Sequence, residues 1–186
     1  MRFFKRLLLV SLILFFAVFI FREWIFGKLI TYRSVSVIKS FPVEEKTLKD
    51  KIEKELQINS ESDIREISLQ ALKITTEELQ FSSHSTTINP NQLIHSKKTH
   101  CVGYAAFFTT VCNYILVMQK MSDKWRVKHR RGKLYFIGIN IHTYFDSKFF
   151  GDHDFVSLEN KETGEIFAVD PSVHEYLRIN FIPYIP

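Results

Sequence analysis

Three residues of this 186-residue chain could together form a nucleophilic site: Cys101, His153 and Asp170. Cys101 opens the most apolar internal run, so we expect it at the N-terminus of a buried helix, where the helix dipole stabilises a thiolate. His153 begins an apparent strand, and Asp170 ends the next one. In this order a thiol, an imidazole and a carboxylate form an activated cysteine nucleophile. We therefore expect His153 to move the proton and Asp170 to orient the imidazole.

The predicted hairpin formed by residues 153–158 and 165–170 is what would bring the base and the acid together. If residue 158 pairs with residue 165, His153 lies opposite Asp170. A slip of one residue would place the two side chains on opposite faces. The alternative for each residue alone is structural, because a cysteine in an apolar helix is often a core residue and Asp-Pro is common in turns.

Other histidines leave alternative sites open. His142 could replace His153 as the base, but it lacks a neighbouring strand that ends in an acid. A metal site could also be built from side chains in and after the polar loop, although their spacing matches no tight ligand pattern: His84, His95, His100 and Cys101. We expect neither a metal nor an organic cofactor.

The second cysteine, Cys112, is not expected to pair with Cys101. Eleven residues of one helix separate the two by roughly 16 Å of rise, whereas a disulfide needs Cα atoms within about 7 Å of each other. Cys112 lies among apolar residues and is expected to be a small buried side chain.

The N-terminus is typical of an uncleaved membrane anchor. A basic tail (1–6) precedes an apolar segment (7–26) that includes Trp24, a residue that suits the bilayer interface. A cleaved signal peptide is the alternative, but no small-x-small cleavage pattern follows. Basic residues flank both ends nearly equally. The short basic tail favours a cytoplasmic N-terminus and an extracytoplasmic domain, either periplasmic or extracellular.

Charge is uneven along the chain, whose formal net charge is +5. Residues 1–33 carry six of the 25 basic residues and one of the 20 acidic ones, so the remainder is balanced. The sequence therefore does not imply nucleic-acid binding. The basic cluster 124–131 is expected either to be an exposed hairpin or to contact anionic lipid headgroups.

The elements expected to position the site are helices first and an antiparallel sheet afterwards, an α+β domain over 43–186 behind a stalk over 27–42. Apolar spacing predicts helices within 43–57 and 61–80, the second capped by Ser60-x-x-Asp63, and a buried core helix over 101–121. Residues 82–99 are expected to be a loop. Strands are predicted over 125–129, 133–141, 153–160 and 165–170, with a turn at Arg130-Arg131-Gly132.

The flanking residues resemble the transglutaminase-like superfamily of cysteine enzymes, which has a papain-like core. The resemblance covers roughly residues 60–175 and rests on Cys101-x-Gly-Tyr-Ala before an apolar helix, His153-x-Phe-x-x-Leu, and Val169-Asp170-Pro171-Ser172. It implies the same roles for Cys101, His153 and Asp170. Many members have Trp where this chain has Phe155, and the family's oxyanion donor before the cysteine has no identified counterpart.

Two other cysteine peptidase families fit less well. C39-type peptidases place Gln about six residues before the cysteine, where this chain has His95. NlpC/P60 peptidases use a second histidine, for which His142 and His174 are poor candidates.

Together the residues and the resemblance predict a membrane-anchored cysteine hydrolase or acyltransferase. It would act through a thioester on amide bonds of a peptide or protein near the membrane. Residues 7–26 would anchor it in the lipid bilayer. The alternative is a catalytically inactive transglutaminase-like module that binds a partner or assembles a complex at the membrane.

Overall fold

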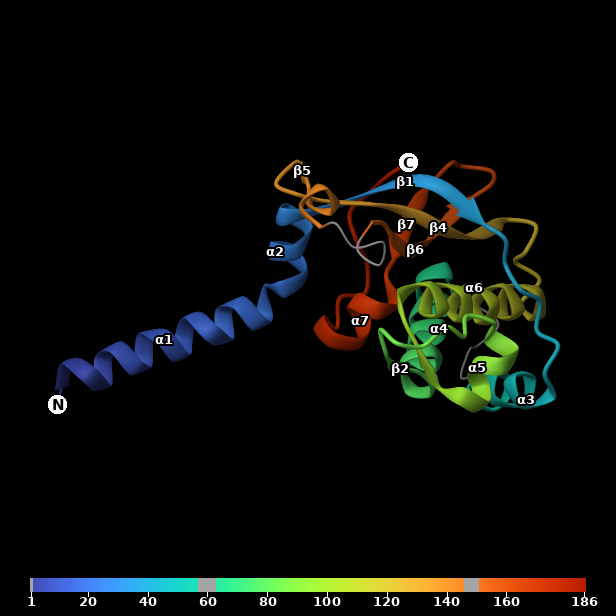
Figure 1. Ribbon diagram of the computed structural model, residues 1–186, viewed down its shortest axis with the longest axis horizontal. Helices are drawn as coiled ribbons and strands as arrows, with labels where there is room; N and C mark the ends of the chain where they lie inside the picture. Colours follow the sequence, from blue (N-terminus) through green and yellow to red (C-terminus); the bar gives the residue numbers. More distant parts are fainter. Residues whose placement is uncertain (1, 57–62, 146–150) are drawn as a thin grey trace.

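A computed structural model describes residues 2–56, 63–145 and 151–186. Helix α1 projects from a two-layered body in which a curved sheet lies over a layer of helices (Figure 1). The elements in chain order are α1 (Arg2–Ile20), α2 (Arg22–Leu29), β1 (Ile30–Ile38), α3 (Lys46–Glu55), α4 (Ile64–Glu78), β2 (Gln80–Phe81), α5 (Pro90–Ser96), β3 (Lys98–Thr99), α6 (Cys101–Met118), β4 (Trp125–Phe136), β5 (Ile139–Asn140), the 3-10 turn η1 (Ile141–Tyr144), β6 (His153–Asn160), β7 (Ile166–Val169), α7 (Pro171–Leu177) and β8 (Tyr184–Ile185).

The main sheet has the strand order β7-β6-β4-β1-β8, and its contacts are antiparallel except between β1 and β8. An antiparallel bridge between Ala168 and Ile182 brings the two edges together, so the sheet is nearly closed. The predicted α+β class is confirmed. The prediction that the helices come first along the chain and the sheet afterwards is confirmed only in part. Strand β1 precedes helices α3 to α6, and it lies in the sheet between β4 and β8.

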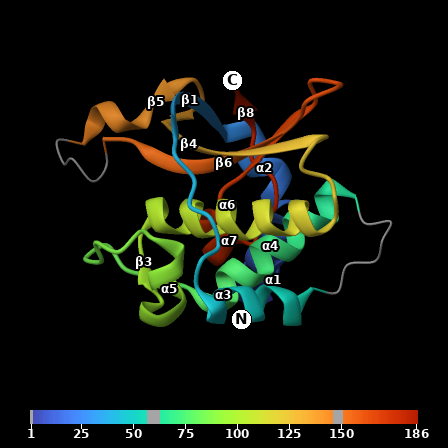
Figure 2. The ribbon, with the colours of Figure 1, turned by 90° about the vertical axis from the view of Figure 1, so that its right-hand side faces the viewer.

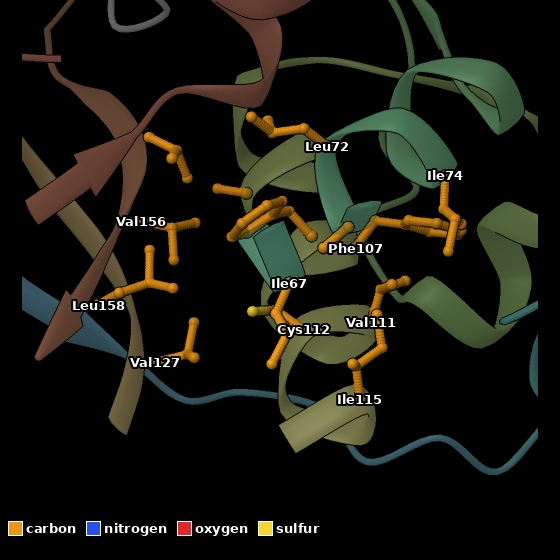
Figure 3. Close-up of a cluster of buried hydrophobic side chains, with 14 of the residues drawn as sticks. Ile67, Leu72, Ile74, Phe107, Val111, Cys112, Ile115, Val127, Val156 and Leu158 are labelled. Atoms are coloured by element: carbon orange, nitrogen blue, oxygen red, sulfur yellow. The ribbon is translucent and has the colours of Figure 1, made fainter. Parts of the chain in front are cut away.

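The larger core lies between α6, α4 and one face of the sheet (Figure 3). Phe107 and Cys112 of α6 are fully buried there, opposite Val156 and Leu158 of β6. Burial raises the pKa of the Cys112 thiol to about 12, which keeps it neutral and unreactive. The prediction that Cys112 is a buried apolar residue is confirmed.

The opposite, concave face of the sheet holds a smaller core. Its members come from strands far apart in the sequence and from the C-terminal segment: Tyr32, Phe155, Ala168, Ile179 and Ile182. Closure of the sheet therefore depends on residues near both ends of the chain.

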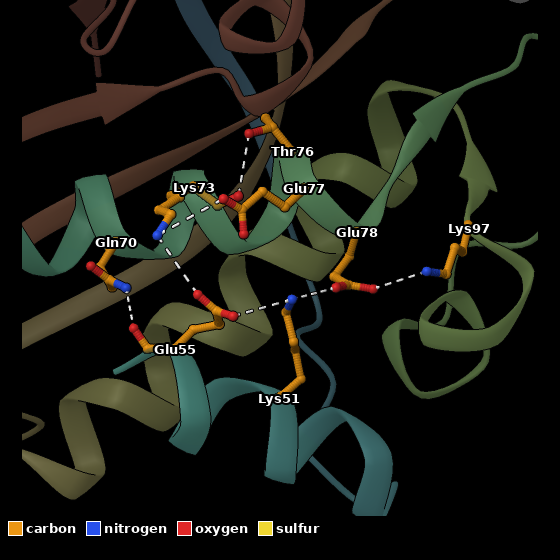
Figure 4. Close-up of polar contacts among 8 residues, drawn as sticks. All are labelled: Lys51, Glu55, Gln70, Lys73, Thr76, Glu77, Glu78 and Lys97. Atoms are coloured by element: carbon orange, nitrogen blue, oxygen red, sulfur yellow. Dashed lines mark hydrogen bonds and ion pairs between the residues drawn. The ribbon is translucent and has the colours of Figure 1, made fainter. Parts of the chain in front are cut away.

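Helices α3 and α4 follow the predicted apolar stripes, with Leu48 and Ile52 fully buried. Ion pairs also connect α4 to α3 and to the end of α5 (Figure 4), because Glu78 of α4 contacts both Lys51 (2.8 Å) and Lys97 (3.5 Å). These contacts support the helical layer on which α6 rests.

The cap of α4 differs from the prediction. Asp63 is the N-cap and forms a reciprocal capping box with Glu66. Ser60, the predicted cap, lies outside the described residues. The capping-box pattern, read from Asp63 to Glu66 instead of from Ser60 to Asp63, would have located this helix start.

The segment 27–42 is not a stalk. Ile30–Ile38 forms β1, which pairs with β4 over its length and with β8. Tyr32 is fully buried within it. The alternation of branched and polar residues here is typical of a strand, but the partners that turn it into one lie about a hundred residues away.

Two further predictions are corrected. Residues 82–99 contain α5, which begins with Pro90 after an Asn89 cap, and the short strand β3. Arg130-Arg131-Gly132 is not a turn but the middle of β4. This position of the strand requires glycine, because a Cβ there would lie 2.2 Å from the Arg33 carbonyl oxygen and 2.8 Å from the Phe155 ring.

The N-terminal apolar segment is divided at Phe21. Helices Arg6–Ile20 and Arg22–Leu29 together are long and apolar enough to cross a membrane, but they are bent by 72°. Arg22 of α2 donates to the Leu177 carbonyl (2.8 Å), and Glu23 accepts from the Asn180 N–H (3.0 Å). These contacts dock α2, which holds the last residues of the predicted anchor, on the domain.

Among the described residues, α6 is the one helix that by itself is long and apolar enough to span a bilayer. Of this helix, 67% is buried inside the protein. This degree of burial fits the predicted core helix.

Candidate active site

Cys101 is the first residue of α6 and is half-buried. His100 precedes it as the N-cap, and the His100 Nδ1 accepts from the Val102 N–H (3.3 Å). The first N–H groups of a helix lack intrahelical acceptors and point beyond its end. The thiol therefore lies where the helix dipole favours negative charge.

Gly103, two residues after the thiol, lies where no side chain would fit. A Cβ there would lie 1.8 Å from the Thr99 Oγ1. Thr99 in turn donates to the Thr87 carbonyl (2.8 Å). The glycine thus lets β3 and its preceding loop pack against the first turn of α6.

The structure brings His153 and Asp170 together. The His153 Nε2 lies 2.6 Å from the Asp170 Oδ2. The register differs from the predicted one by two residues, because Val156 pairs with Val169. An even shift keeps both side chains on the concave face, and His153 reaches the carboxylate diagonally instead of directly across the strands.

The Asp170 carboxylate is fully buried and held at both oxygens. Asp170 is the N-cap of α7, and its Oδ1 accepts from the N–H groups of Ser172 (3.0 Å) and Val173 (3.1 Å) and from the Ser172 hydroxyl (2.7 Å). The Tyr32 hydroxyl donates to Oδ2 at 2.8 Å. These donors fix the orientation of the carboxylate toward His153.

Electrostatics favour a charged pair. Burial disfavours ionisation of Asp170, but His153, Ser172 and Tyr32 outweigh it and hold the Asp170 pKa below its ordinary value. Burial likewise opposes protonation of His153, yet Asp170 and then Cys101 raise the His153 pKa well above 6.5. Both shifts favour an ion pair between the Asp170 carboxylate and the His153 imidazolium.

Cys101 is the third member of this arrangement. It is a hydrogen-bonding partner of His153 and contributes to the raised pKa of the imidazole. Because Nε2 of His153 is on Asp170, Nδ1 is the ring nitrogen left for the thiol. The three predicted residues thus come together from α6, β6 and the start of α7.

A pocket of about 220 Å³ opens at Cys101 and His153. Most of its remaining wall is apolar, and the lining residues are Phe81, Leu134, Ile141, His142, Phe145 and Asp152. His142 is therefore near the thiol, but Asp170 bonds to His153, which leaves His153 as the better-supported base.

A second histidine–aspartate pair lies on the other face of β6. The His129 Nε2 is 2.7 Å from the Asp154 Oδ2, and both side chains are buried. The Arg131 guanidinium contacts the other Asp154 oxygen at 3.2 Å. This pair faces α6, and neither it nor Arg131 lines the pocket. Arg131 interacts electrostatically with Cys101, so we assign the pair to the support of the sheet next to the site.

Tyr32 is the site residue that sequence reasoning missed. It lies in the segment taken for a stalk, and a strand prediction for residues 30–38 would have been needed to place it. The metal hypothesis finds no support in the described part of the chain, where no three His, Cys, Asp or Glu side chains gather as a metal site would require.

The chain matches no family model, no curated protein and no solved structure. The resemblance to the transglutaminase-like superfamily therefore rests on the sequence motifs and stays a prediction.

Proposed function

We propose that this protein is a membrane-anchored cysteine hydrolase or acyltransferase that cleaves amide bonds of a peptide or protein. The observation that carries this proposal is the 2.6 Å contact between His153 and Asp170 beside Cys101. A transglutaminase-like core and anchorage through α1 belong to the same proposal. The sequence motifs support the transglutaminase-like core. The apolar, exposed surface of α1 supports the anchorage.

In the first half-reaction the Cys101 thiolate attacks the amide carbonyl and forms a tetrahedral intermediate. His153, already protonated, gives its proton to the leaving amine as the C–N bond breaks. The products are the free amine and a thioester on Cys101. The N–H groups of the first turn of α6, apart from that of Val102, which donates to His100, would stabilise the oxyanion.

In the second half-reaction neutral His153 takes a proton from water or from an acceptor amine. The resulting nucleophile attacks the thioester, the C–S bond breaks, and the thiolate and imidazolium are restored. Asp170 keeps the ring oriented in both steps, and Tyr32 holds Asp170. The apolar wall of Phe81, Leu134 and Phe145 favours a substrate with an apolar side chain next to the amide.

The test is the pH dependence of Cys101 alkylation by iodoacetamide in the full chain, reconstituted in phosphatidylcholine nanodiscs and mapped by peptide mass spectrometry. A thiolate–imidazolium pair predicts fast alkylation already below pH 7. His153→Ala should slow it at pH 6 by at least about tenfold, since the charge that stabilises the thiolate is lost. Tyr32→Phe should have a smaller effect in the same direction.

His95→Ala is the matched control, because His95 is exposed on α5 and contacts Glu45 instead of the pocket. It should leave the profile unchanged. Slow alkylation that rises only near the ordinary thiol pKa of about 8.5, in a protein that unfolds cooperatively, would contradict the catalytic proposal. It would favour the inactive binding module.

A further inference from the structure

Exposed apolar side chains gather at the end of the body from which α1 departs. They belong to the tip of the β4–β5 hairpin, to η1 and the residue after it, and to the end of α7. β5 and α7 lie on the side of the body from which α1 departs (Figure 1). Figure 2 views the body from the opposite end, so α7 and α1 lie behind α6 there. We call these residues the apolar rim: Phe136, Ile137, Ile139, Tyr144, Phe145, Tyr176 and Leu177, each at least 42% exposed. Isolated exposed apolar residues are ordinary, but a contiguous group marks an interaction surface.

The apolar rim connects the active-site pocket to the N-terminal helices. Phe81, which lines the pocket with Cys101, stacks edge-on against Tyr176 with ring centroids 6.0 Å apart. The next residue, Leu177, lines a second hollow together with Phe136 and with Val18 of α1. On the other side of the pocket, Phe145 belongs to both the pocket wall and the rim.

We infer that the apolar rim rests on the surface of the bilayer that α1 enters, so that the pocket takes its amide substrate from a molecule held in that same bilayer. The part of this inference that concerns the substrate rests on the proposed function, whereas the part that concerns contact with lipid does not. The domain would then lie against the membrane with Cys101 at headgroup level, instead of standing away from it on a flexible stalk.

The first argument for lipid as the occupant is continuity with α1. Its 19 residues are about 28 Å long, close to the roughly 30 Å of a hydrocarbon core. The large apolar side chains that the structure describes between Leu7 and Ile20 are half or more exposed. Because α2 is fastened to the domain through Arg22 and Glu23, the rim must approach any bilayer that holds α1.

The second argument is the composition of the rim. Two of its seven members are tyrosines, Tyr144 and Tyr176, and Trp24 of α2 is also 65% exposed. Tyrosine and tryptophan side chains prefer the interface between headgroups and hydrocarbon.

The third argument is the backbone at Ile137. Ile137 and Gly138 form the two-residue turn between β4 and β5, with φ of 48° and 79°. Such turns favour Asn-Gly, and a β-branched residue at positive φ is strained. Yet Ile137 points outward and is 64% exposed. An apolar contact that the domain itself does not provide would offset this strain.

The contact can be measured with the polarity-sensitive dye NBD attached at residue 137. The full chain with Cys101→Ala and Ile137→Cys is labelled and reconstituted in phosphatidylcholine vesicles. The control is Val117→Cys in the same background, because Val117 is 63% exposed. It lines a hollow with Trp125 at the far end of β4, about 35 Å from the tip at 3.3 Å per residue.

Lipids carrying a doxyl quencher should quench the dye at residue 137 at least threefold more than the dye at residue 117. Iodide in the water should show the reverse order. Equal quenching by lipid at the two positions would overturn the inference. Shielding of residue 137 from both quenchers would also overturn it, because a second copy or another protein segment would then cover the tip.

Ile137→Asn provides a variant that is not expected to unfold. Asn relieves the strain in the turn, so the melting temperature should stay the same or rise, while lipid quenching of a dye at Tyr144→Cys should fall at least twofold. Val117→Asn is the matched control and should leave this quenching unchanged. Loss of quenching without a fall in melting temperature separates membrane contact from folding.

The part that concerns the substrate is tested with two alkylating reagents on the otherwise unmodified chain in the same vesicles. N-dodecyl iodoacetamide partitions into lipid, whereas iodoacetamide stays in water. The dodecyl reagent should label Cys101 at least tenfold faster, and Ile137→Asn should reduce this ratio at least threefold. If iodoacetamide labels Cys101 quickly and the dodecyl reagent does not, the substrate inference fails and the proposed function stands. If both leave Cys101 unlabelled, the proposed function fails, and the quenching result alone decides the bilayer contact.

Discussion

At the residue scale, two neighbouring side chains show how strand alternation separates chemistry from support. His153 points to the concave face, where it contacts Asp170. Asp154, the next residue, points to the opposite face and contacts His129. Consecutive residues of a strand face opposite sides, so one dipeptide serves both the candidate site and the packing of α6 against the sheet.

Asp154 provides a stability prediction with a defined pH dependence. Burial opposes its ionisation, but His129 and Arg131 outweigh it and hold the Asp154 pKa below its ordinary value. A lowered folded-state pKa contributes stability above the unfolded value of about 3.9, and this is lost as pH falls through the folded-state pKa. Asp154→Asn should therefore destabilise the protein by about 3 kcal/mol at pH 7, and by progressively less as the pH falls below about 3.9.

Thermal unfolding of both proteins between pH 3 and pH 7 checks this. Asp152→Asn is the control, because Asp152 also contacts Arg131 (3.6 Å) but is 41% exposed. A surface pair of this kind contributes about 0–1 kcal/mol. A pH-independent loss for Asp154→Asn would mean that packing, and not charge, stabilises this position.

At the element scale, β4 is the strand on which the rest of the sheet depends. It pairs with β1 on one side and with β6 on the other, and it continues through Gly132 where the sequence indicated a turn. The glycine allows β1 to approach closely, since the nearest obstacle to a Cβ is the Arg33 backbone. Backbone cannot move aside in the way that a flexible side chain does.

Gly132→Ala should therefore destabilise the domain by about 3 kcal/mol, at the upper end of the ordinary cost of overpacking. The melting temperature should fall by roughly 5–10 °C. Gly27→Ala is the control, because its Cβ would meet only Pro183 at an ordinary 3.7 Å, and alanine favours the helix α2. An unchanged melting temperature for Gly132→Ala would show that β1 can shift away from β4.

At the scale of the whole molecule, the domain begins earlier than the apolar patterns indicated. Strand β1 lies between β4 and β8, and it brings Tyr32 to the Asp170 carboxylate. The two ends of the domain therefore meet at the site. A boundary at residue 43, as predicted from the sequence, would remove both the strand and the tyrosine.

A truncated chain of residues 43–186 should consequently fail to unfold cooperatively, because the concave core loses Tyr32 and the sheet loses the partner of β4. A chain of residues 22–186 retains α2 and β1 and should fold. Differential scanning calorimetry of the two proteins in a mild detergent decides between them. A cooperative transition for 43–186 would mean that β1 is an added strand instead of a structural one.

The sequence by itself determined what depends on local periodicity. Apolar stripes located α3, α4 and α6, and the same patterns placed Cys101 at the start of a buried helix. Strand and turn signals placed His153 and Asp170 on neighbouring strands. The prediction that the His153 and Asp170 side chains lie on the same face of the sheet also holds, because a register shift of two residues does not change the face.

Only the tertiary structure decided what depends on pairing between distant segments. Hydrogen bonds between strands are not specified by any single segment, so neither the two-residue shift between β6 and β7 nor the place of β1 follows from local pattern. Tyr32 became a site residue because the sheet closes and brings residue 32 to residue 170. The physical reason is that periodicity fixes which way a side chain points, whereas long-range burial and backbone pairing fix what it meets.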